Sequence, residues 1–129
     1  MSHNIRSLSE LDRLLHEPAR LMIATILFSA VEADFLYLLN ATGLTRGNLS
    51  THLARLEEAG YVEIEKTYKG KLPRTICRLT DAGRTAFDAY RKQLREVVEE
   101  LEESKEEKGN ERFFAQGSRL EKQGGGSLG

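Results

Sequence analysis

The sequence predicts a mainly α-helical fold with one small β-hairpin, an α+β class, and three observations support this prediction. Apolar residues recur at helical spacing through most of the first 60 positions. Two alternating segments then flank the basic tip Lys69-Gly70-Lys71, which is the pattern of a hairpin. Finally, an apolar seam spaced three and four residues apart indicates one more helix, with the members Phe87, Tyr90, Leu94, Val97 and Leu101.

Length and composition fit one globular domain. The 129 residues, 40% hydrophobic and 30% charged, allow one modest core. The chain has no apolar run of about 20 residues that could span a membrane, and its N-terminus lacks the apolar stretch of a secretory signal. Cys77 is the only cysteine, so an internal disulfide is impossible. We therefore expect a cytoplasmic protein with no membrane partner.

Charge is distributed unevenly, although the formal net charge is only -1. Positions 44–80 carry seven basic and four acidic side chains, a balance of +3. Positions 81–108 carry six basic and nine acidic side chains, a balance of -3. A basic centre beside an acidic helix suits a protein that offers one face to phosphate.

The N-terminal half predicts three helices. Ser7 or Ser9 can cap a first helix, whose apolar stripe is Leu8, Leu11, Leu14 and Leu15. Pro18 interrupts it, so a second helix is expected to start near Glu17, to be apolar nearly all round and to lie buried.

A short connection over 29–33 follows, with a possible strand in which Val31 points inward. A third helix is expected over 33–40. Gly43 supplies the turn after it, since glycine takes positive φ without steric cost, and Leu44 points back into the core.

A fourth helix has both a start and a stop signal. Thr45 can cap it, Gly60 can end it, and Leu49, Leu53 and Leu56 form one buried edge. The opposite face is small or rich in donors, with the residues Arg46, Gly47, Ser50, Thr51 and Arg55. A helix, a glycine-containing turn and a helix with such a face are typical of a helix-turn-helix.

The hairpin and the last helix follow directly. Val62 and Ile64 alternate with glutamates, as in a half-buried strand. The return strand begins at Pro73, an edge position, and places two sets of side chains on opposite faces: Thr75, Cys77 and Leu79 against Arg74, Ile76 and Arg78. Thr80 can cap the last helix, whose seam is too short for a free coiled coil. The seam could pack against the first helix, against a second copy of the chain, or against both.

From Thr45 to Val62 the sequence resembles small winged-helix transcriptional regulators of the ArsR/MarR-like group. Pro73-Arg-Thr and Leu79-Thr-Asp-Ala-Gly match the second strand and the start of the last helix in that group. The resemblance covers about residues 11–90 and is greatest to a compact prokaryotic subgroup with no appended sensor. It implies a winged helix-turn-helix over 1–108 with terminal dimerisation helices. After Lys105 the sequence signal for order fades, and the glycine-rich end of the chain predicts a flexible tail over 109–129.

The resemblance also implies a homodimer on double-stranded DNA, with the recognition helix 45–59 in the major groove and the wing 66–74 on the backbone or in the minor groove. The implied DNA contacts are Thr45, Arg46, Gly47, Asn48, Ser50, Thr51, Arg55, Lys69, Lys71 and Arg74. The implied dimer interface comprises Leu8, Leu11, Leu15, Phe87, Tyr90, Leu94, Val97 and Leu101.

The chain departs from the metal-sensing members, which carry a cysteine pair or clustered ligands. Its three histidines share no ligand spacing, and no catalytic constellation is present, so we expect no metal, no cofactor and no enzymatic activity. Arg46 could meet a base or a phosphate, and Gly47 could allow close approach of DNA or be merely tolerated. His52 is interpreted as a packed side chain.

These features predict a sequence-specific DNA-binding transcriptional regulator, acting as a repressor by occupying promoter DNA. Two alternatives remain open. One is a protein–protein docking or dimerisation module, which the net charge permits. The other is an architectural DNA binder without sequence preference. The residues do not identify an operator or an effector.

Overall fold

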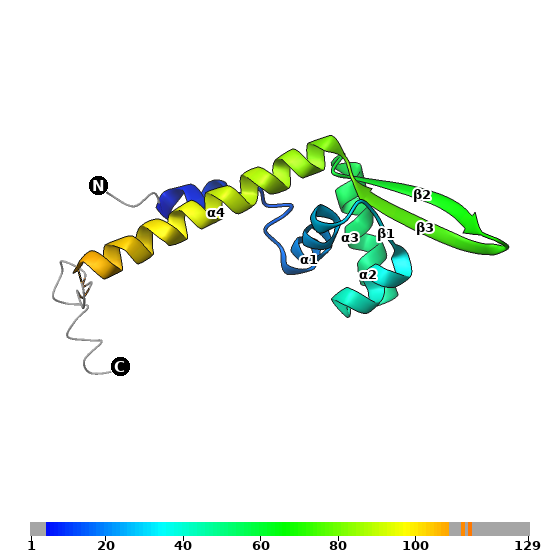
Figure 1. Ribbon diagram of the computed structural model, residues 1–129, viewed down its shortest axis with the longest axis horizontal. Helices are drawn as coiled ribbons and strands as arrows, with labels where there is room; N and C mark the ends of the chain where they lie inside the picture. Colours follow the sequence, from blue (N-terminus) through cyan, green and yellow to red (C-terminus); the bar gives the residue numbers. More distant parts are fainter. Residues whose placement is uncertain (1–4, 109–111, 113, 115–129) are drawn as a thin grey trace. The chain divides into compact units, whose positions relative to one another are not determined.

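The computed structural model describes residues 5–108, 112 and 114. Its elements, shown in Figure 1, are η1 (Ile5–Glu10), α1 (Pro18–Ser29), β1 (Ala33–Asp34), α2 (Phe35–Thr42), α3 (Arg46–Glu58), β2 (Val62–Lys69), β3 (Leu72–Leu79) and α4 (Asp81–Lys108). The predicted α+β class is confirmed. The chain forms two compact units, which divide between Val97 and Val98, and the first unit holds everything described below unless stated. The predicted flexible tail falls almost wholly outside the described residues.

The N-terminal segment differs from the prediction. The structure has the short 3₁₀ helix η1 and then a turn, instead of one α-helix carrying the leucine stripe. The Asp12 carboxylate accepts hydrogen bonds from the amides of Leu14 (2.9 Å) and Leu15 (3.2 Å). A short side chain that bonds to nearby backbone in this way competes with a continuing helix. Leu11 and Leu15 are nevertheless buried, because the turn folds back onto the core.

Helix α1 begins as predicted. Glu17 caps it by accepting a hydrogen bond from the Arg20 amide (2.9 Å), and Pro18 occupies the first turn. The expectation of burial all round was wrong at Met22, which is 38% exposed. At the other end of α1, the Arg84 guanidinium donates hydrogen bonds to carbonyls of the last turn and just beyond, including Ala30 at 2.9 Å.

Strand β1 forms later than the sequence indicated. Val31 is 79% exposed, so its predicted inward position was wrong; it precedes the strand and lies outside the inward–outward alternation of the sheet. Ala33 and Asp34 instead pair with Cys77 and Ile76 of β3. Asp34 also caps α2, where its carboxylate accepts from the Tyr37 amide (2.8 Å).

The sheet has three antiparallel strands in the order β1-β3-β2. Lys69 pairs with Leu72, which leaves Gly70 and Lys71 as a two-residue loop. Gly70 has a φ of 64°, and no described non-glycine residue has positive φ, the pattern of a type II′ hairpin turn. Cys77 faces the core and is fully buried.

One core joins the helices to the sheet. Side chains from α1, α2, α3 and the first part of α4 meet β2 and β3 there, with Leu27, Leu38, Leu49, Val62 and Phe87 among them. Burial of such side chains stabilises a fold by about 1.5–3 kcal/mol each. This core fixes the orientation of α3 and of the hairpin relative to each other.

Candidate nucleic-acid interface

Helix α3 presents one face to the core and the other to solvent. Leu49, Leu53 and Leu56 are buried, with at most 3% exposure, so the helix cannot rotate about its axis without losing core contacts. The opposite face is fixed as a consequence. All of the predicted DNA contacts on this helix and its cap are exposed: Thr45, Arg46, Gly47, Asn48, Ser50, Thr51 and Arg55.

Both ends of α3 have the predicted caps. The Thr45 hydroxyl accepts a hydrogen bond from the Asn48 amide (3.1 Å). At the C-terminus Gly60 has a φ of 82° and donates to Glu57, while Tyr61 donates to Leu56 (both 2.9 Å). This is the Schellman arrangement. It determines where the chain leaves the helix and starts the hairpin.

A helix-turn-helix with an attached hairpin results. Helices α2 and α3 are joined by residues 43–45, where Gly43 has a φ of 73°, and strands β2 and β3 follow α3 at once (Figure 1). These elements define a winged helix-turn-helix, with α3 in the position of the recognition helix and the hairpin in that of the wing.

The cations of this surface fall into two groups. Within the described residues, Arg46, Arg55, Lys66, Lys69 and Lys71 make no ion pair. By contrast, Arg74 lies 3.4 Å from an Asp34 oxygen, and Arg78 bonds to Glu65 (2.7 Å) and Glu32 (2.9 Å). Arg74, a predicted wing contact, is therefore already partly neutralised on the outer face of the sheet.

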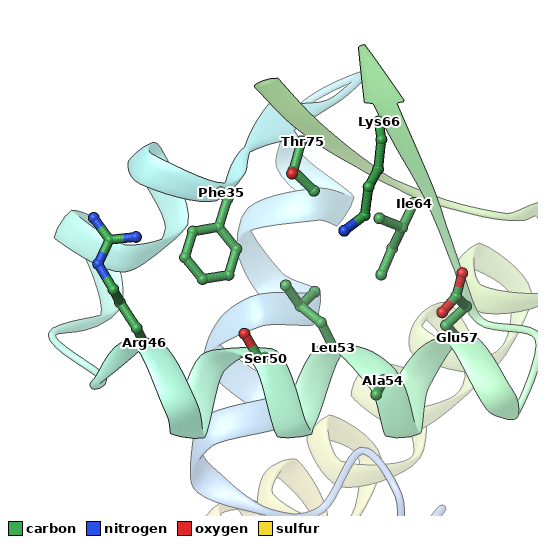
Figure 2. Close-up of a pocket in the computed structure, with 9 residues that line it drawn as sticks. All are labelled: Phe35, Arg46, Ser50, Leu53, Ala54, Glu57, Ile64, Lys66 and Thr75. Atoms are coloured by element: carbon green, nitrogen blue, oxygen red, sulfur yellow. The ribbon is translucent and has the colours of Figure 1, made fainter. Parts of the chain in front are cut away.

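A groove lies between α3 and the hairpin, with a volume of about 470 Å³. Figure 2 shows Arg46, Ser50 and Leu53 on α3, with Phe35, Lys66 and Thr75 around the opposite side. The Arg46 guanidinium carbon lies 5.9 Å from the centre of the Phe35 ring, within the range of a cation–π contact. Glu57 lines the end of the groove near the C-terminus of α3.

Of the residues that line the groove, only Arg46 and Ser50 were among the predicted DNA contacts. Phe35 and Thr75 were not predicted, and Lys66 lay within the predicted wing 66–74 without being named as a contact. One signal could have located Lys66. Side chains alternate along a strand, so Lys66 belongs to the same face as Val62 and Ile64, the face that turns toward α3. The place of Phe35 depends on how α2 packs against α3, for which the sequence carries no local signal.

His52 is a packed side chain, in agreement with its interpretation from the sequence. Its ring Nδ1 accepts a hydrogen bond from the Arg20 guanidinium (3.0 Å) and lies 4.0 Å from a Glu17 oxygen. Arg20 also donates to the Leu14 carbonyl (2.7 Å). This network connects α3 to α1 and leaves His52 facing away from the exposed side of α3.

Cys77 is unsuited to a redox role in the folded chain. Its thiol is fully buried, and burial raises the pKa of Cys77 to about 11, with the carboxylates of Asp34 and Glu57 adding to the effect. The reactive thiolate is therefore scarce near neutral pH.

The predicted dimer residues occupy varied positions. Leu11, Leu15, Phe87 and Tyr90 belong to the core of the single chain, and Leu8 and Leu94 pack against it half-buried. Val97 is 2% exposed. In the second unit, Leu101 is 39% exposed and its neighbour Val98 is 47% exposed. None of the helices in the described part of the chain combines the length and hydropathy needed to cross a bilayer.

The profile of the winged helix DNA-binding domain family matches residues 19–98. The chain is 34% identical over 91 residues to an uncharacterized protein of Methanocaldococcus jannaschii, an alignment that covers 70% of this chain and 98% of that protein. The chain therefore belongs to the winged helix DNA-binding domain family. Its class is that of winged-helix transcriptional regulators.

Solved structures agree with this assignment. A transcriptional regulator homologue from Pyrococcus horikoshii OT3 shares 31% identity over 74% of this chain and 97% of its own, with a TM-score of 0.70. A transcriptional regulator of the MarR family from Enterococcus faecalis V583 shares the fold, with 22% identity, 83% and 96% coverage and a TM-score of 0.64.

Proposed function

We propose that this chain is a homodimeric, sequence-specific regulator that represses transcription by occupying promoter DNA. The observation that supports this most strongly is the exposed face of α3. This face carries Arg46, Ser50, Thr51 and Arg55, and none of its described cations is neutralised by an acid. Beside it, the wing adds Lys69 and Lys71, which have no ion-pair partner in the described part of the chain.

The roles of these residues follow from their chemistry. A helix with small polar side chains can enter the major groove, where an arginine can recognise guanine through two parallel hydrogen bonds. Ser50 and Thr51 can donate to phosphates or contact a thymine methyl group. Arg55, further along the helix, and the wing lysines meet phosphates. Repression then needs only occupancy of the promoter, without catalysis, a cofactor or a further domain.

The test is a titration of labelled DNA from upstream of this protein's own gene, and of random DNA, at two salt concentrations. We expect tight, salt-sensitive binding that prefers the upstream site. The variants Arg46→Glu and Arg55→Glu should lose binding and keep their circular dichroism spectrum. Lys105→Glu, with the same charge change at an exposed position of α4, is the matched control.

Three outcomes would contradict the proposal. Normal binding by both arginine variants would show that α3 does not contact DNA. Equal affinity for upstream DNA, random DNA and sequences selected from a random pool would indicate an architectural binder. No binding to any DNA at low salt would favour the docking module.

The homodimer is supported by the apolar side chains that α4 leaves exposed, Val98 and Leu101. They lie three positions apart and therefore on the same side of α4, where a second copy could cover both. Sedimentation equilibrium should give the mass of two chains for the wild type and a shift toward one chain for Leu101→Glu. A wild-type chain that sediments as a monomer at concentrations that saturate DNA would disprove the dimer.

A further inference from the structure

We infer that the groove between α3 and the hairpin receives a stretch of the DNA backbone, with Lys66 as a phosphate contact and Phe35 as the residue that positions Arg46. This inference rests on the proposed function and adds contacts to it. The two cations come from separate elements: Arg46 from the start of α3 and Lys66 from strand β2. Figure 2 shows the Lys66 ammonium turned into the groove.

The chemistry of the groove matches phosphate. Neither Arg46 nor Lys66 has an ion-pair partner among the described residues. Ser50 and Thr75 add hydroxyl donors on the two sides of the same groove. Cations and hydroxyls at an open surface can bind phosphate oxygens without the cost of displacing an internal carboxylate. Lys66 is therefore free to act where Arg74, paired with Asp34, is not.

The register of the hairpin makes the groove continuous with the wing. Lys66 pairs with Thr75 and Tyr68 pairs with Pro73, and both pairs belong to the face of the sheet that turns toward α3. A backbone strand that passes α3 would thus reach Lys66 before it reaches the tip lysines. The groove lies between the exposed face of α3 and the wing, so the three together form one continuous surface for DNA.

Phe35 restricts the position of the Arg46 side chain beside the groove. The guanidinium lies over the Phe35 ring, and Phe35 itself is half-buried at the start of α2. An arginine side chain loses up to about 2 kcal/mol of rotamer entropy when it is fixed. A ring that already restricts the guanidinium reduces the part of this cost that DNA binding must overcome.

Glu57 provides a second test of phosphate binding in the groove, because its charge is opposite to that of Lys66. Its carboxylate lines the same groove at the end away from Arg46 and would repel a nearby phosphate. Removal of Lys66 and removal of Glu57 should therefore change the affinity for DNA in opposite directions. Both changes should be independent of base sequence, since phosphate contacts carry no sequence information.

The experiment measures the dissociation constant of the full chain for upstream and random DNA between 50 and 200 mM salt. Each lost phosphate contact reduces the slope of log affinity against log salt concentration by about 0.9. Between 50 and 200 mM salt, the fold-decrease in the affinity of K66Q should therefore be about 3.5 times smaller than that of the wild type. K66Q should bind more weakly at low salt to both DNAs, and E57Q more tightly. K105Q removes one exposed lysine elsewhere and should leave the slope unchanged.

Phe35 is tested in the same assay. F35Y keeps the ring and should bind like the wild type, whereas F35L should weaken binding in the presence of Arg46 and have little further effect in an R46Q background. A merely structural role of Phe35 would instead weaken both backgrounds equally.

The outcomes separate the inference from the proposed function. A wild-type chain that does not bind DNA would overturn the proposed function and this inference together. Tight wild-type binding with an unchanged slope in K66Q, or with weaker binding by E57Q, would overturn the groove assignment and leave the regulator intact. Equal losses from F35Y and F35L, or additive losses from F35L and R46Q, would overturn the positioning role of Phe35.

Discussion

Helices α3 and α4 begin with the same capping chemistry in opposite surroundings. In α3 the Thr45 hydroxyl accepts a hydrogen bond from the Asn48 amide (3.1 Å), and in α4 the Thr80 hydroxyl accepts one from the Gly83 amide (3.0 Å). The first of these turns is exposed. The second lies against the end of α3, where the Thr80 amide donates to the Tyr61 carbonyl (2.9 Å).

The space around the glycine differs between the two turns. A Cβ added at Gly47 would meet nothing within 4 Å, whereas one added at Gly83 would lie 2.2 Å from the Tyr61 carbonyl oxygen. Charge differs as well: α3 carries Arg46 in its first turn, and α4 carries Asp81. The exposed turn around Gly47 is therefore accessible to an external partner, whereas the turn around Gly83 packs against Tyr61 and holds the last helix to the domain.

Substitution of the two glycines should produce the largest difference in folding stability. Gly83→Ala should destabilise the domain by about 2–3 kcal/mol, because a new methyl group must displace backbone. Gly47→Ala should stabilise it by up to about 1 kcal/mol, because alanine is the better helix former and the space is open. Urea unfolding followed by circular dichroism measures both. Similar stability changes in the two variants would show that α4 does not approach Tyr61 closely.

The DNA affinity of Gly47→Ala sharpens the same comparison. A variant that is at least as stable as the wild type but binds tenfold more weakly would show that DNA approaches Gly47 within the reach of a methyl group. Unchanged affinity would show that the glycine is merely tolerated at the helix start.

The two caps should differ by a smaller amount. Thr80→Ala removes the bond to the Gly83 amide and also the hydrogen bond that Thr80 donates to the Gly60 carbonyl (2.6 Å). Its cost should be about 1–2 kcal/mol. Thr45→Ala removes one exposed cap and should cost about 0.5–1 kcal/mol. Thermal unfolding of the two variants measures which substitution costs more stability. A larger loss of stability in Thr45→Ala than in Thr80→Ala would contradict this prediction.

The smallest expected effect comes from the charges at the two helix starts. A carboxylate is favourable at a helix N-terminus and a cation is unfavourable. At low salt, Asp81→Asn should lower Tm by about 2 °C. Arg46→Gln should change Tm less, because the loss of an unfavourable cation at the helix N-terminus is offset by the loss of its contact with the Phe35 ring. Only Arg46→Gln should weaken DNA binding. Salt should suppress the Tm change of Asp81→Asn, and a shift that persists in 1 M salt would exclude the dipole as its cause.

Most elements of the fold could be predicted because their causes are local. The start of α1 near Glu17, the Thr45 cap, the turn at Gly43 and the end of α3 at Gly60 each depend on chemistry within a few residues. The buried edge of α3 follows from helical periodicity, which fixed the exposed face that carries the predicted DNA contacts. The N-terminal segment was predicted less well, since the Asp12 side chain replaced the expected helix with a turn.

The sequence by itself therefore determined which segments become helices and strands, and which face of α3 is polar, because spacing and capping act over a turn or a strand pair. Only the tertiary structure decided which cations remain unpaired and which glycine is indispensable. Arg74 meets Asp34 across 40 positions of the chain, and Gly83 meets Tyr61 only because the end of α3 and the start of α4 pack together. Such contacts depend on how distant segments pack, which no local pattern encodes.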